Sequence, residues 1–203
     1  MSPELQILVE SSPKRVYKKG LMIIQEGDVS DTLYVLLRGR VRVYSANIDG
    51  REMIFGDYGQ GEMFGEMSLD GGPRSASVLT VELSECAVVS KRILTAHIEK
   101  YPQFAFEVIA RVIQRARLAT DSAKNLALLD VYGRLKIFLE QAPHEQTDSG
   151  RVLTHKYTHQ NIAQRVGASR EMVSRILKDL ENGGFLASVG RSGIKVIRLP
   201  EKW

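Results

Sequence analysis

Glycine is distributed unevenly along this chain, and its distribution constrains the fold more than any other feature. Between residues 14 and 90, glycines separate short runs rich in Val, Ile, Leu, Tyr and Met. Short apolar runs at regular spacing with glycine turns are typical of a small all-β barrel or sandwich. The Asp-Gly pair within residues 47–51 also indicates a tight hairpin. We therefore predict a β domain at the N-terminus.

The next part of the chain can hold a long helix. No glycine lies between Gly72 and Gly133, and no proline between Pro102 and Pro143. We expect Pro102 in the first turn of this helix. Mostly apolar or small residues then recur at alternating spacings of three and four, at Phe106, Ile109, Ile113, Ala116, Thr120, Ala123 and Ala127.

This heptad pattern has two interpretations. An apolar stripe on a helix usually reflects ordinary core contact. Here the stripe is long, it turns small and polar at Thr120, and it lies between a β domain and a basic segment. We therefore predict a parallel homodimer along this helix. Residues 129–142 should form a separate amphipathic helix, and residues 142–150 a polar loop.

The single cysteine and the charges limit the functional classes. Cys86 alone excludes an internal disulfide and a cluster held by four thiolates. With no signal peptide and no apolar run of about 18 residues, we expect a cytoplasmic protein without membrane contact. Residues 1–149 hold 18 Lys and Arg against 20 Asp and Glu, whereas residues 150–203 hold 10 against 4. Such a basic segment is typical of phosphate contact.

Residues 158–182 predict two short helices joined by a turn. Ala163, Gly167 and Val173 stand where a helix-turn-helix needs a small residue at the crossing, a turn residue able to adopt positive φ, and an apolar packing residue. Each helix also has a residue placed to cap its N-terminus. These caps are Thr158 and Ser169, which we also expect among the residues that contact DNA.

The second of these helices carries polar residues on the face opposite its apolar side. They are Arg170, Glu171, Ser174 and Arg175. The N-terminal residues of such a helix read base edges in the major groove, where Arg can bind guanine and Glu can accept from cytosine. We expect His159 on the first helix to contact a backbone phosphate or stay solvated. The hairpin predicted over residues 185–199 would place Arg191 near phosphates.

Taken together, four segments resemble the cyclic-AMP receptor protein (CRP) and FNR family of bacterial transcription regulators. They are LYVLLRGRVRVY, GEMFGEMSLDGGPRSASV, NLALLDVYGRL and VGASREMVSRILKDLE. The resemblance implies an α+β fold with a double-stranded jelly-roll barrel for a cyclic nucleotide in residues 1–100. A dimerisation helix would follow in 101–129 and a winged helix-turn-helix in 130–203. It also implies ligand-regulated DNA binding without catalysis.

The resemblance further implies a phosphate-binding cassette in residues 61–78. Arg74 and Ser75 would bind the cyclic phosphate, Glu66 would accept from the ribose 2′-hydroxyl, and Gly65 would let the backbone approach. A planar guanidinium suits two phosphate oxygens. The resemblance makes cyclic AMP the leading candidate for the effector.

On the long helix, the resemblance places Arg115 near Glu66 and lets Thr120 reach across the dimer to the base. A ligand that touches both the barrel and the partner's helix could couple its binding to DNA recognition. Two features depart from the family pattern. Ala119 stands where cyclic-AMP receptors carry a second hydroxyl, and the cassette is two residues shorter between Glu66 and Arg74. Cyclic GMP or a cyclic dinucleotide therefore stays open.

Other interpretations concern the same residues. Glu66 and Arg74 could form a structural ion pair in an effector-independent regulator. A metal-dependent oxygenase is disfavoured because all four histidines fall outside the predicted strands of residues 14–90, at His97, His144, His155 and His159. An iron-sulfur cluster needs several cysteines. A haem sensor stays open, although the barrel lacks the histidine that is the commonest axial ligand.

The predicted reading helix combines features of two subgroups of the family. Arg170, Glu171 and Arg175 match the set with which cyclic-AMP receptors read bases, and Ser174 matches a position read by FNR-like members. The resemblance therefore implies a palindromic site with TGTGA-like or TTGA-containing half-sites in double-stranded DNA. The polar loop at residues 145–150 lies where family members touch RNA polymerase.

Overall fold

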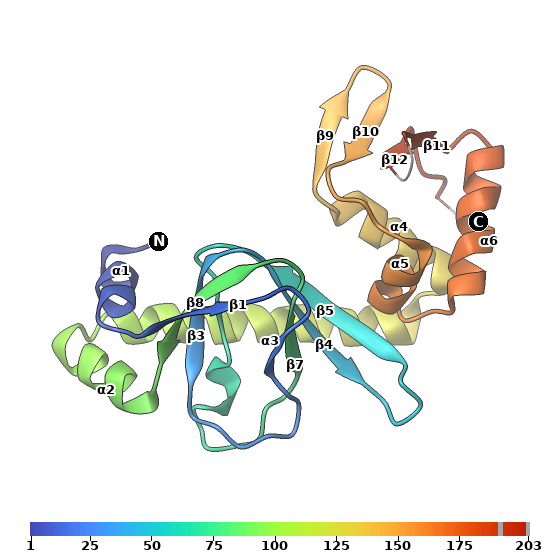
Figure 1. Ribbon diagram of the computed structural model, residues 1–203. Coiled ribbons are helices and arrows are strands. Elements are labelled where there is room, and N and C mark those ends of the chain that lie inside the picture. The colour runs from blue at the N-terminus through green and yellow to red at the C-terminus, as the bar shows by residue number, and fades with distance from the viewer. Residues whose placement is uncertain (191–192, 202–203) are drawn as a thin grey trace. The chain divides into compact units, whose positions relative to one another are not determined.

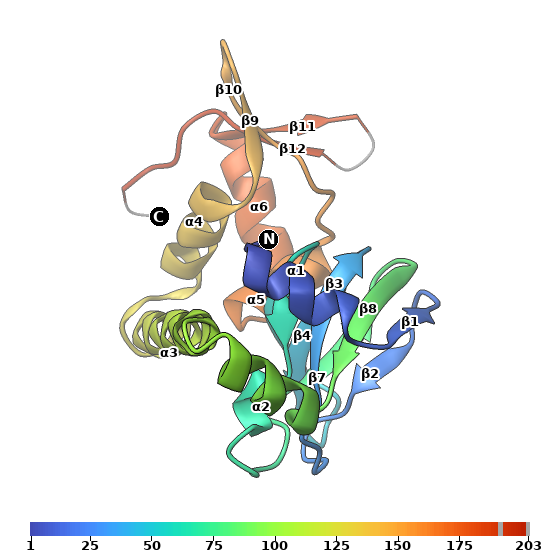
Figure 2. The same ribbon diagram turned by 90° about the vertical axis from the view of Figure 1, so that its left-hand side faces the viewer.

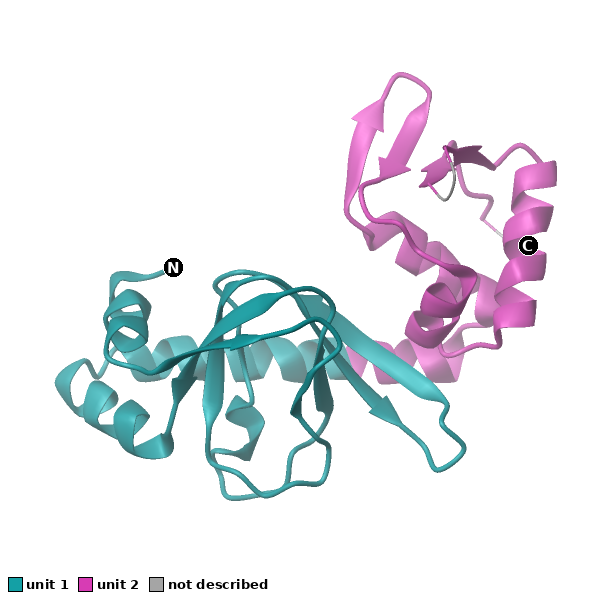
Figure 3. Ribbon diagram, in the orientation of Figure 1, with its two compact units in different colours: residues 1–119 teal, residues 120–203 magenta. Residues whose placement is uncertain are grey.

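The computed structural model describes residues 1–190 and 193–201. The chain divides into two compact units, residues 1–119 and 120–203, which Figure 3 shows in different colours. The division falls within the long helix α3 (Phe104–Leu128), so this helix contributes to both units. The mixed α+β composition agrees with the prediction.

The first unit contains two antiparallel four-stranded sheets (Figure 1). One has the order β1 (Lys14–Tyr17), β8 (Ser84–Val89), β3 (Leu33–Arg38) and β6 (Met63–Phe64). The other has the order β2 (Met22–Ile24), β7 (Ser77–Thr80), β4 (Val41–Ala46) and β5 (Glu52–Tyr58). Strands β4 and β5 form the hairpin predicted at residues 47–51, where Gly50 has a φ of 75°.

The strands alternate their side chains between two cores because successive residues of a strand point to opposite faces. On β3, Leu36 belongs to the core formed by side chains of both sheets, together with Phe64 and Cys86. Leu33 and Val35 point to the other face of the same strand and pack in a second core. The sheet of β1, β8, β3 and β6 is therefore apolar on both faces.

Three helices contribute to this second core. They are α1 (Pro3–Glu10), α2 (Lys91–Lys100) and the start of α3 at Phe104. Figure 2 shows α3 almost end-on with α2 beside it. The prediction that Pro102 lies in the first turn of α3 is wrong. Pro102 lies in a turn that precedes the helix, and its carbonyl accepts from the amide of Ala105 at 3.1 Å.

The second unit combines three further helices with a four-stranded antiparallel sheet. The helices are α4 (Val131–Gln141), α5 (His159–Val166) and α6 (Arg170–Asn182). The sheet has the order β11 (Leu186–Val189), β12 (Gly193–Val196), β10 (Gly150–Leu153) and β9 (His144–Thr147). Its core includes Leu135, Ile162, Val173 and Leu180.

The prediction of a polar loop at residues 142–150 is wrong. Instead, β9 and β10 form a tight hairpin in which Thr147 pairs with Gly150. All four residues of β9 are exposed, so no apolar alternation marks the strand in the sequence. Gly150 is required here because a Cβ would lie 2.3 Å from the carbonyl oxygen of Val196.

None of the helices in residues 1–190 and 193–201 is both long and apolar enough to cross a membrane.

Cys86 provides a test of the inter-sheet core. Its side chain is buried, and burial raises the pKa of the thiol to about 12. Because the thiolate is the reactive form, we expect the native protein at pH 8 to react with an aromatic disulfide roughly a thousandfold more slowly than an ordinary thiol. The absorbance of the released thiol measures this rate.

Protein unfolded in guanidinium is the control and should react at the ordinary rate. Equal rates for native and unfolded protein would contradict the burial of Cys86.

Candidate nucleotide and DNA sites

Gly65 determines the backbone at the start of the cassette. It follows β6 with a φ of 86° and precedes the short 3-10 helix η1 (Glu66–Ser68). A Cβ at this position would lie 2.8 Å from Nη1 of Arg74 and 3.0 Å from the carbonyl oxygen of Thr32. Only glycine therefore satisfies both the positive φ and the available space.

The guanidinium of Arg74 is buried inside the cassette. Nη1 donates to the carbonyl oxygen of Gly65 at 2.6 Å and to Oγ of Ser68 at 2.7 Å. Nη2 donates to Oγ of Ser30 at 2.9 Å and to the carbonyl oxygen of Thr32 at 2.5 Å. Burial lowers the pKa of this group, and the nearby Tyr34 and carboxylates oppose that effect. All four Nη hydrogens are thus directed to protein acceptors.

Glu66 forms its ion pair with Arg115 of α3. Nη1 of Arg115 donates to Oε1 of Glu66, and its Nη2 donates to the carbonyl oxygen of Met63. The guanidinium also lies 4.9 Å from the ring centroid of Tyr58, within the range of a cation–π contact. The ion pair considered between Glu66 and Arg74 is therefore not the one that forms in the described residues.

The second carboxylate oxygen of Glu66, Oε2, lacks a hydrogen-bond partner among the described residues. The side chain is 0% exposed, and no donor in the described parts of the chain lies within hydrogen-bond distance of Oε2. A buried acceptor without a donor carries a desolvation cost of about 1–3 kcal/mol. This oxygen is therefore suited to accept a hydrogen bond from a hydroxyl of a ligand.

The structure brings four of the six predicted effector residues together, namely Gly65, Glu66, Arg74 and Arg115. Ser75 follows directly on an exposed position, where its hydroxyl contacts Sδ of Met67 at 3.5 Å. Thr120 is exposed on α3 and belongs to the second unit. The effector-binding role of each of these residues stays a prediction.

Sequence reasoning missed the residues that surround the two arginines. Ser30 and Thr32 approach Arg74 from the connection between β2 and β3, more than 40 residues away in the chain. No local pattern could reveal that contact. Ser68 lies inside the cassette, and the signal that could have found it is that the five donors of Arg74 need acceptors nearby.

In the second unit, the local signals of the helix-turn-helix are present as expected. The hydroxyl of Thr158 accepts from the amide of Asn161 at 3.1 Å, and that of Ser169 accepts from Met172 at 3.2 Å. Gly167 ends α5 with a φ of 62°. From α4, Arg134 also donates to the carbonyl oxygens of Val166 and Gly167, at 2.7 and 3.3 Å. The turn between α5 and α6 is thus held by Arg134 on its N-terminal side and by the Ser169 cap on its C-terminal side.

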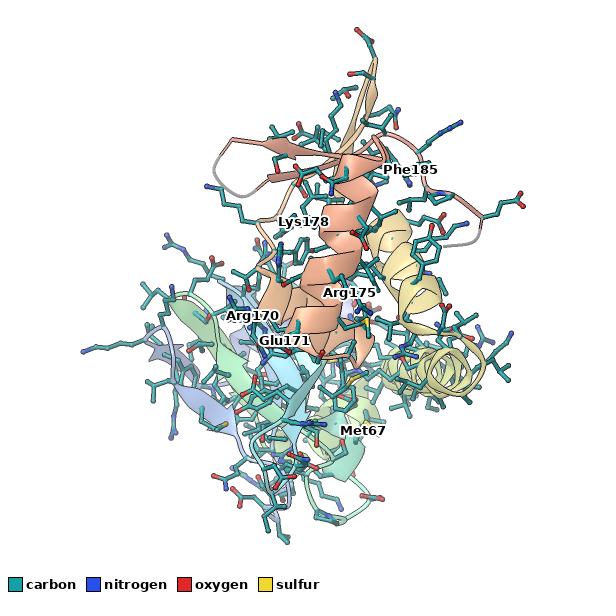
Figure 4. The ribbon with its side chains drawn as sticks, turned by 90° about the vertical axis from the view of Figure 1, so that its right-hand side faces the viewer. Met67, Arg170, Glu171, Arg175, Lys178 and Phe185 are labelled. Atoms are coloured by element: carbon teal, nitrogen blue, oxygen red, sulfur yellow. The ribbon has the colours of Figure 1, made fainter. Side chains whose placement is uncertain are left out.

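The predicted reading residues lie along α6, as Figure 4 shows. Arg170, Glu171 and Arg175 are exposed, whereas Val173 is fully buried on the opposite face. Lys178 is exposed one turn after Arg175 and extends this polar face, which a helical period of 3.6 residues could have indicated. Ser174 is half-buried, and its Oγ lies 2.8 Å from Nδ1 of His159.

The predicted wing is formed by β11 and β12. Arg191 lies outside the described residues, so its predicted phosphate contact stays an expectation. Within the described residues, no group of three or more His, Cys, Asp or Glu side chains is arranged to hold a metal ion.

Comparison with known proteins connects both sites to one family. Residues 14–101 match the cyclic nucleotide-binding domain, and residues 133–201 match the Crp-like helix-turn-helix domain. The "CRP-like cAMP-activated global transcriptional regulator" of Mycobacterium tuberculosis is 32% identical over 180 residues, covering 87% of this chain and 80% of that protein. The "cAMP-activated global transcriptional regulator CRP" of Escherichia coli is 31% identical over 195 residues, covering 94% and 92%.

Solved structures agree with this relationship. The c-di-GMP-responsive global regulator CLP of Xanthomonas campestris has a TM-score of 0.84 and 27% identity, covering 97% of this chain and 99% of that one. The chain belongs to the CRP/FNR family of transcription regulators. The family resemblance and fold predicted from the sequence are confirmed.

Replacing Arg115 by Ala tests the buried ion pair. Glu66 would keep a buried charge with no partner, so we expect the free energy of unfolding to fall by about 3 kcal/mol or more. Arg42→Ala is the matched control because Arg42 and Asp57 form a more exposed ion pair, worth about 1 kcal/mol or less. Urea denaturation of both variants measures the difference. Equal losses would contradict the special role of Arg115.

Proposed function

We propose that the chain is a homodimeric, sequence-specific DNA-binding regulator whose barrel binds a cyclic nucleotide, with cyclic AMP as the leading candidate. The observation that carries this proposal is Oε2 of Glu66, which is buried and has no hydrogen-bond partner among the described residues, in the same cassette as the buried guanidinium of Arg74. One acceptor and one cation at this place suit a ribose hydroxyl next to a cyclic phosphate.

The proposed ligand would use the cassette in the following way. Oε2 of Glu66 accepts from the ribose 2′-hydroxyl, while Oε1 keeps its bond from Arg115. Two phosphate oxygens take Nη hydrogens of Arg74 in place of the hydroxyl oxygens of Ser30 and Ser68. This exchange is favourable because phosphate oxygens carry a negative charge that serine hydroxyls lack, and a guanidinium can pair with two of them at once. Ser75, which is exposed, can donate to the same phosphate.

The relatives support the choice of effector in different ways. The Mycobacterium tuberculosis and Escherichia coli regulators are described as cAMP-activated. The Xanthomonas campestris regulator is described as c-di-GMP-responsive. A cyclic dinucleotide is therefore the alternative effector for this chain, and Ala119 in place of a hydroxyl residue is compatible with it.

The exposed apolar face of α3 supports the dimer. Phe106, Ile109 and Ile113 are 66%, 50% and 46% exposed, and they follow the predicted heptad pattern. We call this exposed apolar stripe of α3 the seam. A seam of this kind is normally covered by a second helix. In the proposed dimer, Thr120 reaches the base of a nucleotide bound to the partner's barrel.

The remaining parts of the proposal concern partners and location. A two-fold dimer would bind a palindromic site, with Arg170, Glu171, Ser174 and Arg175 reading bases. The β9–β10 hairpin, which replaces the predicted loop, is the proposed contact with RNA polymerase. The protein would act in the cytoplasm and without catalysis.

Calorimetric titration of nucleotide-free protein with cyclic AMP tests the effector. We expect saturable binding, its loss in Arg74→Ala, and roughly fivefold weaker binding in Ser75→Ala, which lacks one neutral hydrogen bond. Ser75 is exposed, so its variant should fold normally even if Arg74→Ala does not. Binding of cyclic di-GMP alone would assign the alternative effector. Binding of neither nucleotide would contradict the effector proposal.

Sedimentation of Ile113→Glu tests the dimer. A charge in the centre of the seam should leave monomers at micromolar concentration, because each carboxylate would be desolvated against its partner's apolar side chains. Val29→Glu is the control, since Val29 is 81% exposed and is not part of α3. If Ile113→Glu sediments as the wild-type dimer, the seam is not the interface.

Selection of bound sequences from random DNA tests the reading helix. We expect a two-fold symmetric motif, and Arg170→Ala should lose about 1–3 kcal/mol at one base position in each half-site. Lys178→Ala, further along α6, is expected to weaken all sequences alike and to lower the slope of log affinity against log salt by about one. A motif without two-fold symmetry would contradict the proposal.

A further inference from the structure

The contact between His159 and Ser174 joins the two helices of the DNA-reading unit. Nδ1 of His159, at the start of α5, lies 2.8 Å from Oγ of Ser174 on α6. His159 is exposed, while Ser174 is half-buried one turn after the exposed Arg170. Ser174 therefore faces both His159 and the side of α6 on which the reading residues lie.

A serine hydroxyl has one hydrogen to donate and two lone pairs that accept. If Nδ1 of His159 is unprotonated, Ser174 donates its hydrogen to the imidazole and can offer only lone pairs to a base. If Nδ1 carries a proton, Ser174 accepts from the imidazole and keeps its own hydrogen for a base. The state of His159 thus determines which hydrogen-bonding group Ser174 presents.

In a complex with DNA, the other ring nitrogen of His159 can be fixed by a phosphate. A phosphate oxygen accepts hydrogen bonds and cannot donate one, so of the two neutral tautomers of His159 it selects the one with the proton on Nε2. In that tautomer Nδ1 is the acceptor, and the hydroxyl of Ser174 must donate to it. The phosphate contact and the base contact are then connected through two hydrogen bonds.

We propose that His159 is a positioning residue for specificity: it binds a DNA phosphate through Nε2 and orients the hydroxyl of Ser174 so that Ser174 accepts from an exocyclic amino group. In the major groove, adenine and cytosine present amino groups where thymine and guanine present carbonyl oxygens. Ser174 should therefore favour adenine or cytosine at one position of each half-site. This inference rests on the proposed DNA-binding function.

Two variants of His159 separate this role from a simple phosphate contact. His159→Arg keeps a donor for the phosphate but has no acceptor, because a guanidinium only donates. The hydrogen of Ser174 is then free for a base, and the preference should change from adenine or cytosine to guanine or thymine. His159→Ala should remove the preference and lower the salt slope by about one.

The experiment is selection from random DNA followed by affinity measurements on the four bases at the selected position. We expect the wild type to favour adenine or cytosine by about tenfold. Ser174→Ala should abolish this preference, and adding His159→Ala should weaken binding without changing base preference further. Lys156→Ala is the control, since Lys156 is exposed on the segment before α5 and should not affect a single base.

The outcomes distinguish this inference from the proposed function. If the wild type selects no motif, the DNA-binding proposal itself fails. If the wild type selects a motif but His159→Arg and His159→Ala keep the same base preference, His159 is only a phosphate contact and the inference is overturned. A preference that changes in His159→Arg and disappears in Ser174→Ala supports it.

Discussion

The ion pair between Glu66 and Arg115 is the contact on which the proposed mechanism depends. It joins the cassette of the barrel to the long helix α3, and it leaves Oε2 of Glu66 buried and without a donor in the described residues. Arg115 is held further by the carbonyl oxygen of Met63 and the ring of Tyr58. A ligand hydroxyl on Oε2 would therefore act on a carboxylate already fixed to α3, and occupancy of the barrel could influence that helix directly.

The path from α3 to the reading helix can be followed through short-range contacts. After α3, the side chain of Asp130 accepts from the amide of Gly133 at 2.7 Å and caps α4. Arg134 of α4 donates to the carbonyl oxygen of Leu129 at 2.7 Å, and it also holds Val166 at the turn before α6. The guanidinium of Arg134 thus contacts both the connection between α3 and α4 and the turn between α5 and α6. Coupling through these contacts would change the affinity for DNA when the ligand binds.

Sequence reasoning succeeded where structure depends on neighbouring residues. The caps at Thr158 and Ser169 and the positive φ of Gly167 follow from local chemistry, and the β4–β5 hairpin follows from its Asp-Gly pair. Sequence reasoning failed where contacts join residues far apart in the chain, or where a strand has no apolar alternation. The β9–β10 hairpin was missed because β9 is wholly exposed, and the acceptors at Ser30 and Thr32 were missed because they are far from Arg74 in the chain.

The central claim is that nucleotide binding in the barrel changes DNA binding by the second unit. The most direct measurement is the affinity of the protein for its selected DNA site at fixed salt, with and without saturating cyclic AMP. The account predicts tighter or weaker binding by about 5- to 150-fold, the range typical of allosteric coupling, and an equal change in nucleotide affinity when DNA is present. The same DNA affinity with and without bound nucleotide would contradict it.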